Sequence, residues 1–171
     1  MLLITSSSSF MKHRLSFTRL SDCMEHLPIA ARWAEGEWGY IRNKGIEYRE
    51  GVMDYLKDSV FIATFAGKPV AMFALLNHEF HEDLMHSPGA SNLPHVLELM
   101  YVYVEKDYRG LGFGRQIIDA AKRLAQEMGA ERIQLDTLKP GLNRMYEKQG
   151  AKPLCDHHLF SHTTDVFTMK L

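Results

Sequence analysis

The sequence predicts a mixed α/β fold, and three observations lead to this prediction. Extended apolar segments alternate along the chain with amphipathic helical segments. One strand–helix–strand unit, over residues 96–137, has a glycine-rich turn between its first strand and its helix. The length of 171 residues suits one domain with a sizeable core. We therefore expect a single domain over residues 1–171, with residues 1–12 as a frayed tail.

The N-terminal half combines extended and helical segments. Alternating or β-rich residues predict strands over 14–20, 60–66 and 70–77. Helical spacing of apolar residues predicts helices over 24–33 and 46–56. Gly67-Lys68-Pro69 joins two of the strands into a hairpin. Residues 34–44 are aromatic and interrupted by glycine, so we expect a loop there, and the polar segment 78–94 predicts a second, long loop.

The C-terminal half also combines predicted strands and predicted helices. Apolar, β-rich segments predict strands over 96–104, 132–137, 152–160 and 166–171. Periodicity and breaker residues predict helices over 113–128 and 142–149. The first of these helices is the clearest, because apolar residues recur at helical spacing from Ile117 to Met128 and Gly129 follows as a stop.

Composition and charge exclude several classes of protein. Lys and Arg number 20 against 21 acidic residues, a net charge of −1 that argues against a general nucleic-acid binder. Cys23 and Cys155 lie too far apart to suggest a disulfide framework or a metal knuckle, and a reducing cytoplasm fits them. No apolar segment is long enough to span a membrane, and the N-terminus lacks the features of a secretory signal. We expect a cytoplasmic protein with no membrane or nucleic-acid partner.

The most informative segment is the glycine-rich turn from Arg109 to Gly114. A strand that ends in such a turn and opens a helix directs several backbone N–H groups towards one point, where an anion can bind. The spacing is not the Gly-x-Gly-x-x-Gly of dinucleotide-binding proteins, and the Gly-Lys-Ser/Thr of a P-loop is missing. The turn therefore predicts a phosphate site of another kind. The alternative is a loop that only connects strand to helix.

Two motifs carry a resemblance to a known family. Arg109-Gly-Leu-Gly-Phe-Gly114 resembles the acyl-CoA-binding signature Arg/Gln-x-x-Gly-x-Gly/Ala of the GNAT superfamily of N-acyltransferases. Tyr146-Glu-Lys-Gln-Gly150 resembles that family's Tyr-Glu-Lys-x-Gly, with Ala151 in place of the usual phenylalanine. The strong part covers residues 98–153. The resemblance implies a mixed, mostly antiparallel central sheet with helices on both faces.

The resemblance also implies acetyl-CoA as co-substrate, with no metal. Glycines in the turn keep side chains away from the backbone amides, so that these can bind the pyrophosphate. A helix N-terminus adds roughly 0.3–2 kcal/mol for an anion. The expected cofactor-binding residues of the turn are Arg109, Gly110, Leu111, Gly112, Phe113, Gly114 and Arg115. Arg115 has the alternative role of a solvated side chain at a helix start.

Further cofactor contacts are implied on the strand before the turn. In the family this strand parts from its neighbour, and backbone groups of Val102, Tyr103 and Val104 would pair with the pantetheine arm. One N–H there can stabilise negative charge on the thioester oxygen by about 3 kcal/mol. Asn143 is a further expected contact, although the family's asparagine usually lies nearer to Lys139.

Two side chains are candidates for proton transfer. A lysine-like amine must lose a proton before it attacks, at a cost of about 4–5 kcal/mol at pH 7. Glu98 is the candidate base, and period-two alternation places it on the strand face of Met100, Val102 and Val104. The alternative for Glu98 is a surface charge. Tyr146 matches the family's tyrosine that protonates the leaving thiolate, and the alternative is a core tyrosine.

The acceptor side is expected in the N-terminal half. Trp33, Trp38 and Tyr40, with nearby glutamates, suit a cationic amine. The alternative is a pair of core tryptophans beside solvated glutamates. Four histidines in or next to the long loop have no convincing metal spacing: His78, His81, His86 and His95. We therefore expect no metal.

The leading functional prediction is an N-acetyltransferase that moves an acetyl group from acetyl-CoA to a primary amine by direct attack in a ternary complex. The acceptor can be a small molecule or a peptide. One alternative is a non-catalytic acyl-CoA-binding module on the same fold. Another is an acetyltransferase acting on charged tRNA, against which the near-neutral charge weighs. Dimers are common in the similar family, which allows a homodimer here.

Overall fold

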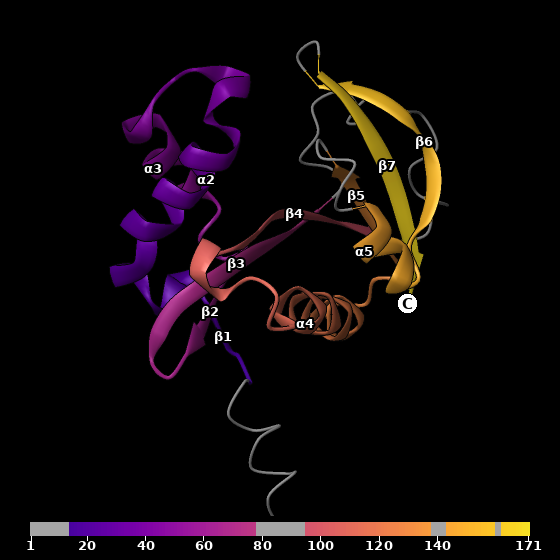
Figure 1. The fold of residues 1–171 in the computed structure, drawn as a ribbon, viewed down its shortest axis with the longest axis horizontal. Helices are drawn as coiled ribbons and strands as arrows, with labels where there is room; N and C mark the ends of the chain where they lie inside the picture. The colour runs from indigo at the N-terminus through magenta and orange to yellow at the C-terminus, as the bar shows by residue number, and fades with distance from the viewer. Residues whose placement is uncertain (1–13, 78–94, 138–142, 160–161) are drawn as a thin grey trace, which may run out of the picture.

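The computed structural model describes residues 14–77, 95–137, 143–159 and 162–171, and within them seven strands form one sheet (Figure 1). The strand order is β1-β2-β3-β4-β5-β7-β6. The strands are β1 Ser16–Arg19, β2 Val60–Phe65, β3 Lys68–Asn77, β4 Val96–Val104, β5 Arg132–Thr137, β6 Lys152–Leu159 and β7 His162–Lys170. Neighbours run antiparallel except β4 and β5, which run parallel. The predicted mixed, mostly antiparallel sheet is confirmed.

Helices cover both faces of this sheet (Figure 1). The helices are α2 Leu27–Arg42, α3 Ile46–Tyr55, α4 Phe113–Glu127 and α5 Asn143–Lys148. Residues of α2 and α3 pack in one buried cluster with one face of the sheet, and residues of α4 and α5 pack in a second cluster with the other face. Each central strand therefore has apolar side chains on both faces, as buried strands require.

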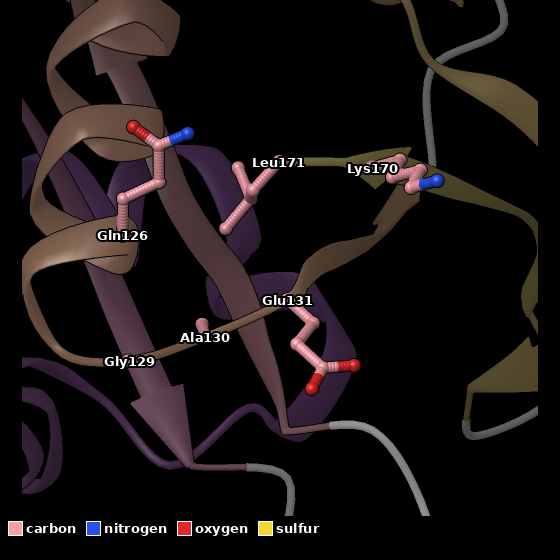
Figure 2. Close-up of a pocket in the computed structure, with 6 residues that line it drawn as sticks. All are labelled: Gln126, Gly129, Ala130, Glu131, Lys170 and Leu171. Carbon is pink, nitrogen blue, oxygen red and sulfur yellow. The ribbon is translucent and has the colours of Figure 1, made fainter.

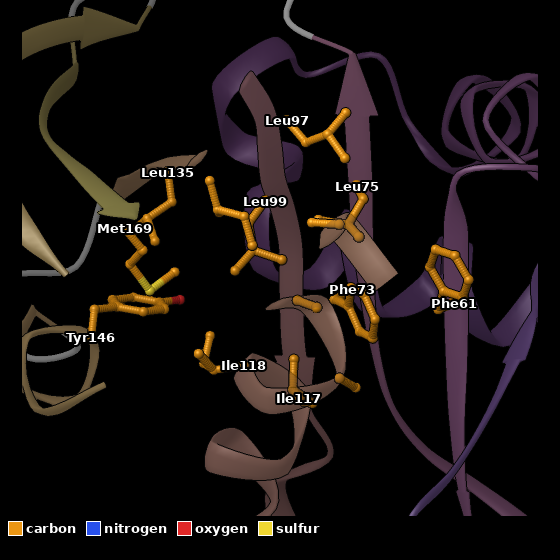
Figure 3. Packing of buried hydrophobic residues seen from close by; sticks show 14 of the residues in the cluster. Phe61, Phe73, Leu75, Leu97, Leu99, Ile117, Ile118, Leu135, Tyr146 and Met169 are labelled. Atoms are coloured by element: carbon orange, nitrogen blue, oxygen red, sulfur yellow. The ribbon is translucent and has the colours of Figure 1, made fainter. Parts of the chain in front are cut away.

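Strand β3 shows how the two cores share one strand. Phe73 and Leu75 point into the cluster with α4, shown in Figure 3, while Met72 and Ala74 point into the cluster with α2 and α3. All four are buried. Opposite β3, the apolar stripe of α4 includes Ile117, which is fully buried. This packing fixes the start of α4 relative to the central strands.

The segment 34–44 is helical up to Arg42, and the predicted loop is wrong. Glycine inside a helix costs about 1 kcal/mol relative to alanine, and the segment contains two. Tertiary packing outweighs this cost, because Trp38 contacts the sheet through Tyr101, with ring centroids 5.4 Å apart. The helix instead ends at Asn43, which has the left-handed conformation (φ 52°) common at helix ends.

Other boundaries differ by a few residues. The first strand ends at Arg19, since two 3-10 turns, Leu20–Asp22 and Met24–His26, precede α2. The final hairpin is confirmed, but β7 begins at His162 instead of residue 166. The first residues of β7 are polar, so they lack the apolar pattern that predicts a strand. Pairing with β6 extends the strand into them.

Several expectations lie outside the described residues. These are the frayed tail over 1–12 and the long loop over 78–94 with His78, His81 and His86. Within the described part of the chain, the helices are too short or too polar to cross a bilayer.

Candidate active site

The two parallel strands at the centre of the sheet separate along their length. β4 and β5 pair only where Val96–Glu98 faces Arg132–Gln134. Beyond these residues β5 continues beside β7, and β4 continues beside β3. Residues 99–104 of β4 therefore have no strand partner on the β5 side among the described residues. Backbone groups along this edge can hydrogen-bond to a ligand that lies between the strands.

A β-bulge interrupts β4 in the same region. Ala74 pairs with Met100, whereas Met72 pairs with Tyr103, so β4 has one more residue than β3 between these pairs. Tyr101 lies in the bulge with φ 53°, a left-handed conformation that bulky residues rarely adopt. The bulge bends the strand where it leaves β5.

The bulge also overturns a prediction about strand faces. Glu98 was expected on the same face as Met100, Val102 and Val104, from strict alternation, and this holds for Met100 but not for the two valines. The extra residue inverts the alternation, because Met100 and Tyr101 both pack on the side of α2 and α3 while Val102 and Val104 pack on the side of α4. Glu98 alternates with buried Leu97 and Leu99 of the α4 side. Glu98 therefore faces α2 and α3.

The glycine-rich turn joins the 3-10 turn Lys106–Tyr108 to α4. Gly110 and Gly112 have φ values of 79° and 82°, which favour glycine at both positions. A Cβ at either position would meet no other described atom within 4 Å. Gly112 is the N-cap of α4 and no side chain caps the helix. The first N–H groups of α4 lack intrahelical acceptors, and the open space before them can hold an anion.

Arg109 connects this turn to the end of β4. Its Nε donates a hydrogen bond to the carbonyl oxygen of Val104 over 2.9 Å, and its guanidinium carbon lies 5.5 Å from the ring centroid of Tyr103. These contacts hold a positive charge next to the unpaired edge of β4. The charge is therefore available to a ligand that extends from the turn along the strand.

The remaining residues of the turn have different surroundings. The Phe113 side chain is buried and anchors the start of α4 in the core. A Cβ at Gly114 would lie 2.9 Å from Sδ of Met145, so this glycine lets α5 approach α4 closely. Leu111 is exposed. Arg115 is also exposed and makes no hydrogen bond or ion pair with another described residue, so both expected roles, cofactor contact and solvated side chain, stay predictions.

Tyr146 of α5 is buried among apolar residues (Figure 3). Its ring lies below Met169, and its hydroxyl points away from α5 towards the side of β4. The residue is 5% exposed, and no described residue hydrogen-bonds to the hydroxyl. Desolvation by burial raises the pKa of Tyr146 to about 12. Because buried hydroxyls are nearly always paired, this one marks a place where a ligand atom can bind.

Asn143 has its side-chain amide engaged by the protein. The Thr137 hydroxyl donates to Oδ1 of Asn143 over 2.6 Å, and Nδ2 of Asn143 donates to Oδ2 of Asp165 over 2.7 Å. These bonds tie the start of α5 to the end of β5 and to Asp165, which pairs with Thr137 inside β7. Asn143 thereby positions α5 and its Tyr146, and a direct cofactor contact stays a prediction.

The three aromatic residues expected to bind the acceptor differ in exposure. Trp33 is 5% exposed, stacks on Tyr103 and donates from Nε1 to Glu105, so it is a core residue. Trp38 is partly buried. Tyr40 is 48% exposed and accessible to a ligand.

Sequence reasoning missed a buried arginine next to the bulge. Arg49 of α3 is 5% exposed, and its Nη1 donates to the Tyr101 hydroxyl over 3.0 Å. A signal was present, because Arg49 precedes Met53 and Leu56 by four and seven residues and therefore lies on the apolar face of the helix. When α3 packs against the sheet, a charge at this position is buried and needs hydrogen-bonding partners.

A shallow pocket of about 410 Å³ lies at the other end of α4 (Figure 2). Its lining residues are Gln126, Gly129, Ala130, Glu131, Lys170 and Leu171. The backbone N–H groups of Ala130 and Glu131 already donate to protein carbonyls, so they offer no donors to a ligand. Among the described residues, no group of three His, Cys, Asp or Glu side chains is placed to hold a metal ion. The glycine turn and the parted strands remain the candidate site.

Several solved structures have the same fold as this chain. Ard1 from Thermoplasma volcanium superposes with a TM-score of 0.69 at 14% identity, covering 92% of this chain and 97% of that one. A chain of the NatC complex bound to Gag peptide and CoA gives 0.62 at 16% identity, covering 92% and 99%. A GNAT family acetyltransferase from Elizabethkingia anophelis with acetyl-CoA bound gives 0.53 at 14%, covering 71% and 82%.

The sequence comparison is more specific than these structural likenesses. No curated protein matches the chain significantly. The profile of the acetyltransferase (GNAT) family matches residues 26–151, more than half of the 171 residues. This range includes the parted strands, the bulge, the glycine turn and Tyr146. The chain belongs to the GNAT family of acetyltransferases.

Proposed function

We propose that the protein is an acetyl-CoA-dependent N-acetyltransferase that acetylates a primary amine by direct attack in a ternary complex. The observation that carries this proposal is the Tyr146 hydroxyl, which has no partner among the described residues and points towards the side of β4 (Figure 3), the strand that separates from β5. An anion site at the start of α4 follows β4 directly along the chain. Together they suit a long ligand with a phosphate group at one end and a reactive group at the other.

The residues present fit coenzyme A. The N–H groups from Leu111 to Arg115 and the charge of Arg109 would hold the pyrophosphate, because a Cβ at Gly110 or Gly112 would point into open space. Backbone groups of Val102 to Val104 would pair with the pantetheine arm. Acetyl-CoA, as co-substrate, supplies an activated thioester. An N–H at the bulge would donate to its carbonyl oxygen and stabilise the negative charge that develops there.

Glu98 is proposed to accept the proton of the attacking amine, directly or through a water molecule. It is the last residue of β4 that pairs with β5, so it lies where the two strands begin to separate. Its face of the strand is the side of α2 and α3. The amine would therefore approach from the side of those helices, where Trp38 and the exposed Tyr40 are proposed to contact it.

Tyr146 is proposed to stabilise the departing sulfur. With a pKa of about 12, its phenol stays protonated over the physiological range. Complete proton transfer to a thiolate of ordinary pKa would cost about 5 kcal/mol. The geometry and the pKa together favour a hydrogen bond from the hydroxyl to the sulfur, with solvent supplying the proton after release.

The acceptor is proposed to be a small-molecule or peptide amine in the cytoplasm, with no metal, nucleic acid or membrane involved. The NatC neighbour was solved with a peptide, which makes peptide N-termini one class to test. The experiment is a screen of acetyl-CoA turnover over small amines, polyamines, lysine peptides and N-terminal peptides, measured as free thiol release. Turnover dependent on one acceptor class supports the proposal. Coenzyme A binding without turnover on any amine would instead identify a binding module.

A further inference from the structure

The bulge in β4 depends on one residue in a conformation that its side chain disfavours. Tyr101 has φ 53°, and for bulky residues this conformation persists only where the surrounding structure enforces it. The bulge sets the direction of the next peptide group, whose N–H belongs to Val102. That peptide lies on the strand edge proposed to face the thioester. The groups that hold Tyr101 therefore influence the proposed reaction centre.

Among the described residues, a hydrogen bond and a ring contact hold the Tyr101 side chain, and both come from the helices on the acceptor side. Its hydroxyl accepts a hydrogen bond from Nη1 of Arg49, 3.0 Å away. Its ring meets the ring of Trp38 edge to face, with centroids 5.4 Å apart. The first contact is directional, whereas the ring contact tolerates rotation of the tyrosine. Arg49 is therefore the residue that fixes the hydroxyl in place.

Arg49 is in turn held rigidly. Its side chain is 6% exposed, and its Nε donates to Oε2 of Glu35 over 3.2 Å. The Glu35 carboxyl lies against Gly39, where a Cβ would come within 2.5 Å of Oε1. Gly39 thus leaves room for Glu35 to reach Arg49. A buried charge with a matched partner is well suited to hold a neighbouring group in one position.

We propose that Arg49, held by Glu35, is a positioning residue for acetyl transfer: it locks Tyr101 in the left-handed conformation and so orients the β4 peptide that contacts the thioester. This inference rests on the proposed function. It connects α2 and α3, on the acceptor side, with the strand that holds the acyl donor. The pyrophosphate turn lies beyond the other end of this strand segment and does not depend on Arg49.

The main test is Tyr101→Phe, which keeps the ring and removes only the oxygen that Arg49 binds. We expect kcat to fall about tenfold, with the Kd for coenzyme A unchanged and the melting temperature lowered by only a few degrees, because the buried Arg49 loses one acceptor. Tyr48→Phe is the matched control, because the variant keeps the ring that lies 5.9 Å from the guanidinium carbon of Arg49 and removes a hydroxyl that, among the described residues, accepts a 3.4 Å bond from exposed Arg42. We expect this control to retain the wild-type kcat.

Arg49→Lys is the second variant, which keeps the buried charge but loses the forked geometry. We expect the double variant Arg49→Lys/Tyr101→Phe to be no slower than the slower single variant, because both remove the same contact. If the two losses in kcat multiply, the two residues act independently and the proposal is overturned.

Amide hydrogen exchange separates this inference from the proposed function. We expect the amide of Tyr103, which pairs with Met72 of β3 next to the bulge, to exchange about tenfold faster in Tyr101→Phe than in the wild type without any ligand, whereas Tyr48→Phe leaves it unchanged. A wild-type protein without turnover would refute the proposed function and leave this exchange test standing. Unchanged exchange at Tyr103, or an active wild type that Tyr101→Phe does not slow, would refute the role of Arg49.

Discussion

At the scale of single residues, the candidate site depends on groups whose surroundings give them unusual properties. Tyr146 is a buried hydroxyl without a hydrogen-bond partner among the described residues. Arg49 is a buried charge on an apolar helix face. The sequence predicted the importance of Tyr146 through its motif, but only the structure shows that burial raises its pKa. Arg49 was missed because its partner Tyr101 is 52 positions away in the chain.

Replacement of Tyr146 by phenylalanine should separate chemistry from stability. We expect kcat to fall about 10- to 100-fold, because the hydrogen bond to the sulfur is lost, while the free energy of unfolding stays equal or rises, since no partner among the described residues loses a bond. Steady-state kinetics and chemical denaturation measure the two quantities. Tyr55→Phe, at an exposed position of α3, is the control. A large loss of stability in Tyr146→Phe would show that the hydroxyl has a structural partner.

The raised pKa of Tyr146 also predicts how stability depends on pH. Below pH 10 the phenol is protonated in both states, so it adds no pH dependence. Between pH 10 and about 12 the unfolded chain ionises while the folded protein does not. The unfolded state is then favoured by up to about 3 kcal/mol. Denaturation curves of the wild type should show this loss relative to Tyr146→Phe, and parallel curves would contradict the burial argument.

Glu98→Gln tests the proposed base. We expect kcat/KM to fall about 100- to 10,000-fold with little change in coenzyme A affinity, because the amide cannot accept the amine's proton. Glu127→Gln, at the exposed end of α4, is the matched control and should retain activity. Rates within twofold of the wild type would remove Glu98 from the mechanism.

At the scale of elements, the helices and strands with a strong apolar pattern were predicted, whereas features that depend on tertiary contacts were not. α4 follows from its apolar stripe and its bounding glycines, and the structure agrees to within one residue at its end. α2 was predicted too short, because Gly36 and Gly39 weaken the local helical signal. The bulge at Tyr101 was not predictable from alternation, since it depends on pairing with β3 and on contacts from two helices.

The two glycines of α2 should respond oppositely to alanine. Gly36 is exposed and a Cβ there meets nothing within 4 Å, so Gly36→Ala should stabilise the protein by about 0.5–1 kcal/mol. Gly39→Ala should destabilise it, because the Cβ would displace the Glu35 carboxyl that pairs with Arg49. Thermal unfolding of both variants gives the comparison. Equal shifts of the same sign would contradict the role assigned to Gly39.

At the scale of the whole molecule, the main feature is a sheet whose two central strands, β4 and β5, separate partway along their length. Helices on both faces bury the strands, and only three residue pairs join β4 to β5 before the strands separate. The sequence predicted the sheet type and the place of the glycine turn. It could not predict which face each side chain of β4 occupies, because the bulge inverts the alternation halfway along the strand.

The central claim is that the uncapped turn before α4 binds the diphosphate of coenzyme A. Isothermal titration calorimetry with coenzyme A tests it most directly, using the wild type and Gly112→Ala, whose Cβ strains a backbone with φ 82°. We predict saturable binding by the wild type and at least about tenfold weaker binding by the variant, with far-ultraviolet circular dichroism unchanged. No heat of binding to the folded wild type, or equal affinity of the two proteins, would contradict the account.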